Sequence, residues 1–217
     1  MTIVINGSGT VTGISVGGLP DNTVDNGTMA DDAIGVDELS ATGTASSSTF
    51  LRGDNAWAAP GGIANACQFR VTSNWNPSDS WTDITANWEV NDTAGYSTLG
   101  SAVTESSGIF SFPSTGFWYI TFGGMADYNG SAVNWASLEL DATINNSSYT
   151  ALTLATAGIA DGGSNTYTQL NGDAILDVTD TSNVKVKLRT ETDADTTWHG
   201  ATANNQTWIT FIRLADT

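Results

Sequence analysis

Residues 108–124, Gly-Ile-Phe-Ser-Phe-Pro-Ser-Thr-Gly-Phe-Trp-Tyr-Ile-Thr-Phe-Gly-Gly, constrain the fold more than any other stretch of the chain. Residues 109–112 are β-forming, and the Pro-Ser-Thr-Gly sequence that follows is typical of a turn, because proline fixes φ and glycine permits positive φ. Residues 117–122 are aromatic or β-branched at every position. The stretch therefore predicts two antiparallel strands joined by a tight corner.

The second of these strands has two apolar faces. Side chains alternate along a strand, so its residues divide into two sets. One set is Phe117, Tyr119 and Thr121, and the other is Trp118, Ile120 and Phe122. A strand that is apolar on both sides is expected deep in a β-sandwich or against a neighbouring subunit. Trp118 and Tyr119 are the residues that we predict at such a subunit interface.

The composition favours many short strands and turns over helices. Only 13% of the 217 residues are charged, while Gly, Ser, Thr, Asn and Asp are abundant. Residues 133–141 and 208–214 read as further strands. In residues 183–189 the alternation is cleanest, with an apolar row predicted inward and a basic row outward. The apolar row is Val184, Val186 and Leu188, and the basic row is Lys185, Lys187 and Arg189.

The order Gly108-x-Phe110-x-Phe112-Pro113-x-x-Gly116-x-Trp118-Tyr119-x-Thr121-Phe122 resembles the signature of complement-head (C1q) and tumour-necrosis-factor (TNF) jelly rolls. The resemblance covers roughly residues 64–217 and extends to the order of the later strands. It implies an all-β fold in which a ten-stranded jelly-roll β-sandwich assembles as a homotrimer.

The N-terminal region repeats an apolar residue every five positions in an otherwise polar segment. These residues are Ile14, Leu19, Val24, Met29, Ile34 and Leu39. A short repeat of this kind cannot bury its apolar residues alone and needs neighbours. We therefore predict an extended trimeric shaft whose apolar residues face the shared axis. A disordered linker is the alternative.

Residues 41–60 contain Phe-Leu-Arg-Gly-Asp, two small residues and Trp, after a serine-rich run. This order resembles a segment that recurs in bacteriophage tail-fibre and other virion-fibre proteins. Phe50 and Trp57 are the apolar residues expected to gather three chains into a collar. The Arg-Gly-Asp triplet is interpreted as structural, with its charges paired either with each other across the glycine turn or with a neighbouring chain. The predicted domains are a shaft or anchor at 1–45, a collar and hinge at 46–62, and a knob at 63–217.

The charge excludes several classes of partner. The net charge of −17, from 23 acidic and 6 basic residues, should repel nucleic acid and anionic membranes. Residues 1–6 have neither a basic region nor a long apolar core, so neither a secretory signal nor a membrane span is expected. The acidic pairs at 31–32, 177–180 and 193–195 lack a calcium-loop pattern. We expect no cofactor, and bound calcium remains the alternative.

The sequence contains no pattern that predicts catalysis. Its one histidine, His199, and its one cysteine, Cys67, lack the partners that acyl-transfer triads and zinc sites require. A carboxylate pair for glycoside cleavage remains open, because an acidic chain will always bring some pair together. Four residues are instead candidates for binding at the knob surface, since exposed aromatic rings stack on sugars or partner surfaces. They are Trp75, Trp81, Trp198 and His199.

These features predict a structural, non-enzymatic virion protein, assembled in the host cytoplasm. Its N-terminus would bind other virion proteins, and its knob would bind a glycan or protein of the host surface. Tail fibre and capsid-decorating head fibre or cement protein are both open, since the chain is short for a complete tail fibre. A monomeric carbohydrate-binding or carbohydrate-degrading β-sandwich is the main rival. A secreted complement-like ligand is less consistent with residues 41–60.

Overall fold

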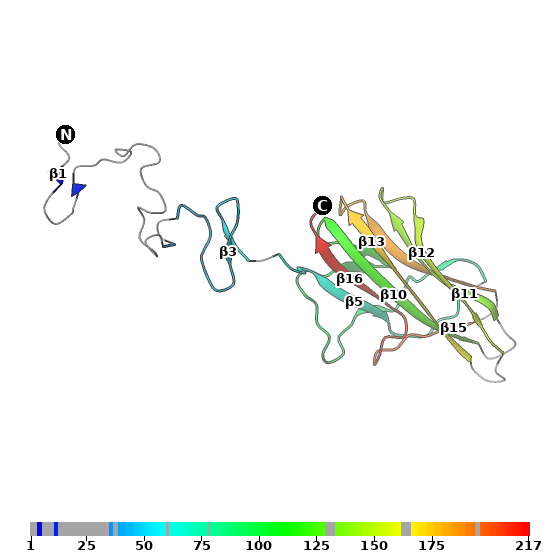
Figure 1. The fold of residues 1–217 in the computed structure, drawn as a ribbon. Coiled ribbons are helices and arrows are strands. Elements are labelled where there is room, and N and C mark those ends of the chain that lie inside the picture. The colour runs from blue at the N-terminus through cyan, green and yellow to red at the C-terminus, as the bar shows by residue number, and fades with distance from the viewer. Residues whose placement is uncertain are drawn as a thin grey trace. The chain divides into compact units, whose positions relative to one another are not determined.

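The computed structural model describes residues 4–5, 11–12, 35–36, 39–59, 61–77, 79–128, 133–161, 166–193 and 196–217. The chain divides into two units, Met1–Gly61 and Gly62–Thr217 (Figure 1). The finer division of the N-terminal region into shaft and collar stays a prediction. All described regular elements are strands, and the described residues include no helix with the length and apolarity of a membrane span.

The first unit contains two short antiparallel strand pairs. Strand β1 (Val4–Ile5) pairs with β2 (Val11–Thr12). Strand β3 (Phe50–Leu51) pairs with β4 (Trp57–Ala58) and forms a hairpin over the Arg-Gly-Asp sequence. The apolar repeat predicted for the shaft lies outside the described residues from Ile14 to Ile34, and only its last member, Leu39, is described.

The second unit is a sandwich of two sheets. The first sheet has the spatial order β13-β10-β16-β5-β7, with β15 (Thr197–Trp198) beside β10. Figure 1 shows β13, β10, β16 and β5 side by side. The bounds of its five main strands are β5 (Ala66–Val71), β7 (Trp88–Val90), β10 (Gly116–Tyr128), β13 (Thr166–Val178) and β16 (Trp208–Ala215).

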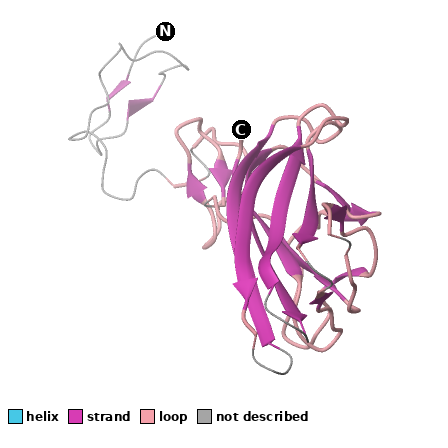
Figure 2. Cartoon of the chain, turned by 90° about the vertical axis from the view of Figure 1, so that its right-hand side faces the viewer, coloured by secondary structure: helices cyan, strands magenta, loops and turns pink. Residues whose placement is uncertain are grey.

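The second sheet has the order β12-β11-β14-β9-β8, with β6 (Thr82–Asp83) beside β14. Its main strands are β8 (Thr104–Ser106), β9 (Ile109–Ser111), β11 (Val133–Thr143), β12 (Thr150–Ile159) and β14 (Lys185–Thr192). Among the ten main strands, the chain crosses between the sheets after β7, β9, β10, β12, β13 and β14. The predicted ten-stranded jelly roll is therefore confirmed, with β6 and β15 as short additions. Figure 2 shows the strands of the sandwich from a second direction.

The core lies between the sheets and is built largely on residues 108–124. Trp118, Ile120 and Phe122 of β10 have no exposed surface. The ring of Phe110 on β9 lies 5.2 Å from that of Phe69 on β5 and 5.3 Å from that of Phe211 on β16. Edge-to-face and tilted ring pairs of this kind add to the gain from burial. The predicted corner is also present, since Gly116 has φ of 132°, which an L side chain rarely adopts.

The predicted alternation of β14 is confirmed. Val184, just before the strand, and Val186 and Leu188 within it are buried, and the basic row lies on the outward face. On its partner β11, the outward side is largely covered and not open to solvent. Glu139 and Asp141 lie on its outward side but are only 8% and 2% exposed. Side chains of neighbouring segments cover them, as described below.

Strands β12 and β13 were not identified from the sequence. They form the same open edge of the sandwich, and the Thr153 hydroxyl of β12 donates a hydrogen bond to the Asp173 carbonyl of β13 at 2.8 Å. The Asn-Gly-Asp sequence at 171–173 reads as a turn, yet it lies in the middle of β13. The reason is packing, because a Cβ at Gly172 would lie 2.5 Å from Cζ of Phe122.

We predict that Gly172→Ala destabilises the knob by about 1–3 kcal/mol, because the added methyl group forces the buried Phe122 ring to move. Urea denaturation followed by tryptophan fluorescence measures this loss. Gly62→Ala is the control, since nothing lies within 4 Å of a Cβ at Gly62. Equal stability of the two variants would contradict this account of the strand glycine.

Candidate interaction surfaces

The outward side of the first sheet has an apolar end. The strand register aligns Ile175 of β13, Tyr119 of β10 and Ile212 of β16 in one row. Phe117 lies one step along the same side of β10. Ile175 is 65% exposed and Phe117 is 39% exposed. We call Phe117, Tyr119, Ile175 and Ile212 the apolar face.

The structure separates the two residues that were predicted together at a subunit interface. Tyr119 lies in the apolar face, where its interface role stays a prediction. Trp118 points the other way and is 0% exposed, with its ring 5.2 Å from that of Phe112. The assignment of Trp118 to an interface is wrong, because the core of its own chain already covers this side chain.

The edge formed by β12 is also apolar. Leu152 and Leu154 are 42% and 55% exposed on this strand. An edge strand offers unpaired backbone groups as well as side chains to a partner. The knob therefore presents two separate apolar surfaces, the apolar face and the β12 edge.

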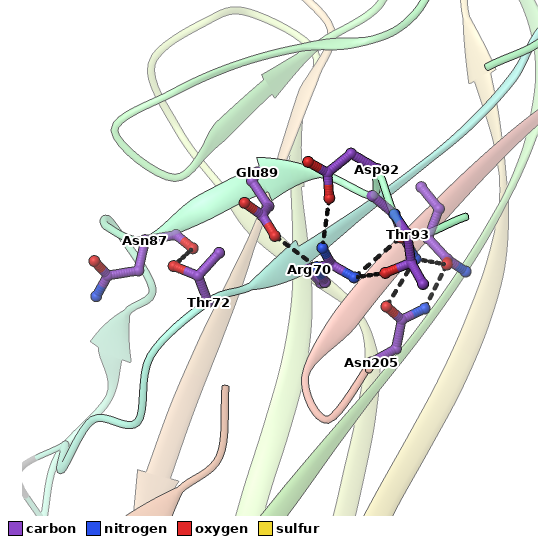
Figure 3. A network of polar contacts seen from close by, with 9 residues as sticks. Arg70, Thr72, Asn87, Glu89, Asp92, Thr93 and Asn205 are labelled. Atoms are coloured by element: carbon purple, nitrogen blue, oxygen red, sulfur yellow. Dashed lines mark hydrogen bonds and ion pairs between the residues drawn. The ribbon is translucent and has the colours of Figure 1, made fainter. Parts of the chain in front are cut away.

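The other half of the first sheet's outward side is sealed by a polar network around Arg70 (Figure 3). Arg70 points outward from β5, yet it is 1% exposed. Its guanidinium donates to Glu89 at 2.6 Å, to Asp92 at 2.7 Å and to Asn91 at 3.1 Å, and also to Thr93. The segment after β7 is therefore folded over the sheet by one buried cation.

The network continues from Asn91 toward the centre of the sheet. The Asn91 amide donates to Gln68 at 3.0 Å and to Asn205 at 2.9 Å, and Gln68 donates to Thr210 at 2.6 Å. Sequence reasoning missed this site. An arginine at an outward strand position signals a solvated charge, and its partners follow about twenty positions later in the chain, after loop residues whose path the sequence does not specify.

Three of the four candidate binding residues lie near the end of β10. Trp75 and Trp198 exchange backbone hydrogen bonds of 3.0 and 2.9 Å, and their rings stack at 5.9 Å with an interplanar angle of 25°. Trp198 is 0% exposed, so its prediction as a surface residue is wrong; it supports Trp75 from below. Nε2 of His199 lies 2.5 Å from Oδ1 of the buried Asp127.

The fourth candidate, Trp81, is half-buried and lies over the second sheet. The Arg189 guanidinium lies 5.2 Å from its ring centroid, within the range of a cation–π contact. Binding by Trp75, Trp81 and His199 to an external molecule stays a prediction.

The outward side of the second sheet carries a half-buried charge cluster. Arg189 reaches Asp83 at 3.1 Å and Asp141 at 3.3 Å, and Lys187 donates to Asp83 at 2.8 Å. Two members of the basic row of β14, Lys187 and Arg189, are thus paired with acids from neighbouring segments. Within the described residues, no three His, Cys, Asp or Glu side chains are grouped so as to hold a metal ion.

Glu139 lies in this cluster and has an unusual proton affinity. Burial, together with the hydrogen bond and the negative charge of Asp141, raises its pKa to about 7 against the opposing effect of Arg189. The neighbouring charges include Glu191 on β14. Glu139 therefore keeps its proton at a pH well above that at which a carboxyl group ordinarily loses it.

The hairpin of the first unit exposes apolar side chains. Phe50 is 47% exposed and Leu51 is 38% exposed, while Trp57, the cross-strand partner of Leu51, is half-buried. Arg52 and Asp54 pair at 3.2 Å, with both side chains about half exposed, so the predicted pairing across the glycine is confirmed. The collar role of Phe50 and Trp57 and the axis role of the half-buried Leu39 stay predictions.

Two solved structures share the fold of the knob. Murine APRIL, in a crystal structure at pH 5.0, is 8% identical, with a TM-score of 0.51; the match covers 69% of this chain and 98% of that one. Eiger TNF from S. frugiperda is 15% identical, with a TM-score of 0.50 over 70% of this chain and 93% of that one. No family model and no curated protein matches the sequence.

At these identities the likeness establishes the fold alone. The knob is a jelly roll of TNF type, and the predicted likeness to that group is confirmed at the level of the fold. The likeness of residues 41–60 to bacteriophage fibres stays a prediction.

The two carboxylates that hold Arg70 should differ in their contribution to stability. Glu89 is 32% exposed and Asp92 is 80% exposed. We predict that Glu89→Gln costs about 1–3 kcal/mol, because it leaves a buried cation short of a charged partner. Asp92→Asn should cost well below about 1 kcal/mol, since water screens that pair. Urea denaturation of both variants checks the ranking, and a larger loss for Asp92→Asn would contradict it.

The raised pKa of Glu139 predicts a pH-dependent effect of Glu139→Gln. Because the pKa rises from 4.5 to about 7 on folding, the neutral carboxyl favours the folded state below pH 4.5, and this advantage disappears as the pH rises through about 7. The melting temperature of the variant should equal that of the parent at or below pH 4.5. At about pH 8 it should be a few degrees higher than that of the parent.

Asp177→Asn, at an exposed position of β13, is the control for removal of one negative charge anywhere on the chain. Differential scanning calorimetry across the pH range measures all three proteins. A Glu139→Gln effect that does not change with pH, or that Asp177→Asn reproduces, would show that Glu139 does not hold a proton in the folded state.

Proposed function

We propose that this chain is the subunit of a homotrimeric virion fibre, with an N-terminal shaft that anchors it to the particle and a C-terminal knob for adhesion to the host surface. The observation that carries the proposal is the apolar face on a chain of net charge −17. Clustered exposed apolar side chains on a soluble protein mark an interaction site. On a strongly acidic chain, such an apolar cluster is best explained by another surface that covers it.

A second copy of the chain is the partner that fits. The knob has two apolar surfaces in different places, the apolar face and the β12 edge. A head-to-tail contact between two different surfaces closes into a ring when the rotation between copies allows it. The resemblance of residues 108–122 to complement-head and TNF signatures implies a ring of three.

The first unit supports the fibre part of the proposal. Its hairpin holds Phe50 and Leu51 exposed on a short ribbon, which is marginal by itself in water. Three such hairpins would cover one another's apolar side chains and form the collar. The resemblance of residues 41–60 to virion-fibre segments supplies the biological context, and three knobs on one shaft would give avidity from weak single contacts.

The assembly is tested by light scattering of the full chain and of residues 62–217. We expect a mass near three times 22.6 kDa for the full chain. Ile175→Asp should give monomers, because it places a charge within the apolar face, at an exposed position of the edge strand β13. Ile144→Asp, at a loop position that is 75% exposed, is the matched control and should remain trimeric.

A monomeric parent chain, or an Ile175→Asp variant of trimeric mass, would overturn the assignment of the interface. The virion role is tested separately, by labelling purified particles with an antibody against the knob in electron microscopy. Label on the tail or on the capsid supports the role and identifies which structure carries the fibre, whereas particles without the protein would refute it.

A further inference from the structure

A pocket of about 200 Å³ lies beside Trp75 in the knob. Its walls come from the end of β5, the loop that carries Trp75, and the segment that runs from β6 toward β7. The side chains that matter for the argument are Val71, Trp75, Thr82, Asp83, Thr85 and Asn87. The residues around the pocket thus include one tryptophan beside residues that carry hydroxyl, amide and carboxylate groups.

The indole wall is fixed in place. Trp75 stacks on the fully buried Trp198 and is joined to it by two backbone hydrogen bonds. On either side, Asn74 accepts a hydrogen bond from the Gly200 amide at 3.1 Å, and Asn76 donates one to the Thr196 carbonyl at 3.0 Å. A ring held in this way loses little conformational freedom on binding, which favours affinity.

The opposite wall is fixed as well. The Thr72 amide donates to the Asn87 carbonyl at 2.9 Å, and the Ile84 amide donates to the Leu188 carbonyl at 3.0 Å. Asn87 adopts φ of 63°, a conformation that asparagine tolerates and that is concentrated at functional sites. The pocket is therefore formed in advance on both sides.

Asp83 gives the pocket an oriented acceptor. Lys187 and Arg189 hold its two oxygens at 2.8 and 3.1 Å from the side of the sheet. These cations balance its charge, so the carboxylate can accept hydroxyl donors without repelling a neutral ligand. Among the described residues, the buried indole Nε1 of Trp75 has no hydrogen-bond partner.

We propose that this pocket binds a neutral pyranose ring of a glycan. The apolar C–H face of a sugar ring would stack on the Trp75 indole, and its hydroxyl groups would exchange hydrogen bonds with Asp83, Thr85 and Asn87. A volume of about 200 Å³ suits one ring rather than a longer chain. Anionic ligands are disfavoured by Asp83 and by the net charge of −17.

The place of the pocket fits an adhesive knob. The chain enters the sandwich at Ala66, which pairs with Ile212 close to the end of β16. Trp75 bridges to Trp198, which pairs with Ala126 near the far end of β10. The pocket therefore lies toward the end of the sandwich opposite the entry of the chain. This inference rests on the proposed adhesive function for its biological meaning only, since the sugar contacts come from a single knob.

The test is fluorine NMR of the full chain labelled with 5-fluorotryptophan and titrated with D-galactose, D-glucose, D-mannose and N-acetyl-D-glucosamine. Trp75→Phe assigns the Trp75 resonance. We expect at least one sugar to shift that resonance saturably, with a dissociation constant on the order of a millimolar. Sorbitol, a polyol without a ring, should leave it unmoved. If no sugar moves the resonance, or if sorbitol moves it equally, the proposal is overturned.

Two variants keep the test independent of the stability of the Trp75–Trp198 stack. Asn87→Gly and Thr85→Val should each weaken sugar binding at least about fivefold, because each removes a hydrogen-bonding group from the rim. Glycine adopts positive φ readily, so the backbone at position 87 is preserved. Asn146→Gly is the matched control, since Asn146 has φ of 55° and is exposed on another loop. Unchanged binding in both rim variants would overturn the site.

Light scattering of the same samples separates this inference from the fibre. A trimer that binds none of the sugars would contradict the sugar-binding proposal and support the fibre. A monomer that binds a sugar at Trp75 would contradict the fibre and support the sugar-binding proposal.

Discussion

The contact of the Phe110 ring with rings of the opposite sheet is the interaction on which the rest of the knob depends. Phe110 comes from β9 in the second sheet. The rings of Phe69, Trp88 and Phe211 come from the first sheet, and their centroids lie 5.1 to 5.3 Å from that of Phe110. Once these rings are buried, strand alternation determines which side chains point outward. The inward packing therefore places both the apolar face and the buried Arg70 on the outward side of the first sheet.

The outward side of the first sheet is divided into unlike halves. Over β13, β10 and β16 it carries exposed apolar groups, whereas over β5 and β7 a polar network covers it. A partner that covers apolar surface gains only at the first half and would have to desolvate satisfied polar groups at the second. This asymmetry gives the sheet one preferred way to receive a second copy.

The sequence predicted those parts of the fold whose signal is local. The corner at 113–116, the inward row of β14 and the ten-stranded jelly roll follow from turn chemistry, alternation and one motif. It did not predict β13, because the glycine at position 172 is required by its packing against Phe122, a residue some fifty positions earlier. Trp118 and Trp198 were misassigned for a related reason. The identity of an aromatic residue on a strand or in a loop does not show whether a distant segment of the chain will bury it.

The candidate site divides in the same way. Aromatic character marked Trp75 and Trp81 in advance, since tryptophan in polar company is unusual. The pocket wall formed by Thr85 and Asn87 and the raised proton affinity of Glu139 depend on side chains that meet only after the sheets have packed. Such groups carry no pattern in sequence, and only their positions in space reveal them.

The basic residues are all engaged within the chain itself. Arg52, Arg70, Lys187, Arg189 and Arg213 pair with carboxylates, and Lys185 donates to Ser111. The acids therefore outnumber their partners everywhere on the surface, and copies approaching one another meet a like charge at long range. Dissolved salt shortens that range to about 8 Å at physiological ionic strength. The proposed assembly through apolar contacts would then be sensitive to the ions of the medium, and the fraction of assembled protein would differ between a dilute and a saline environment.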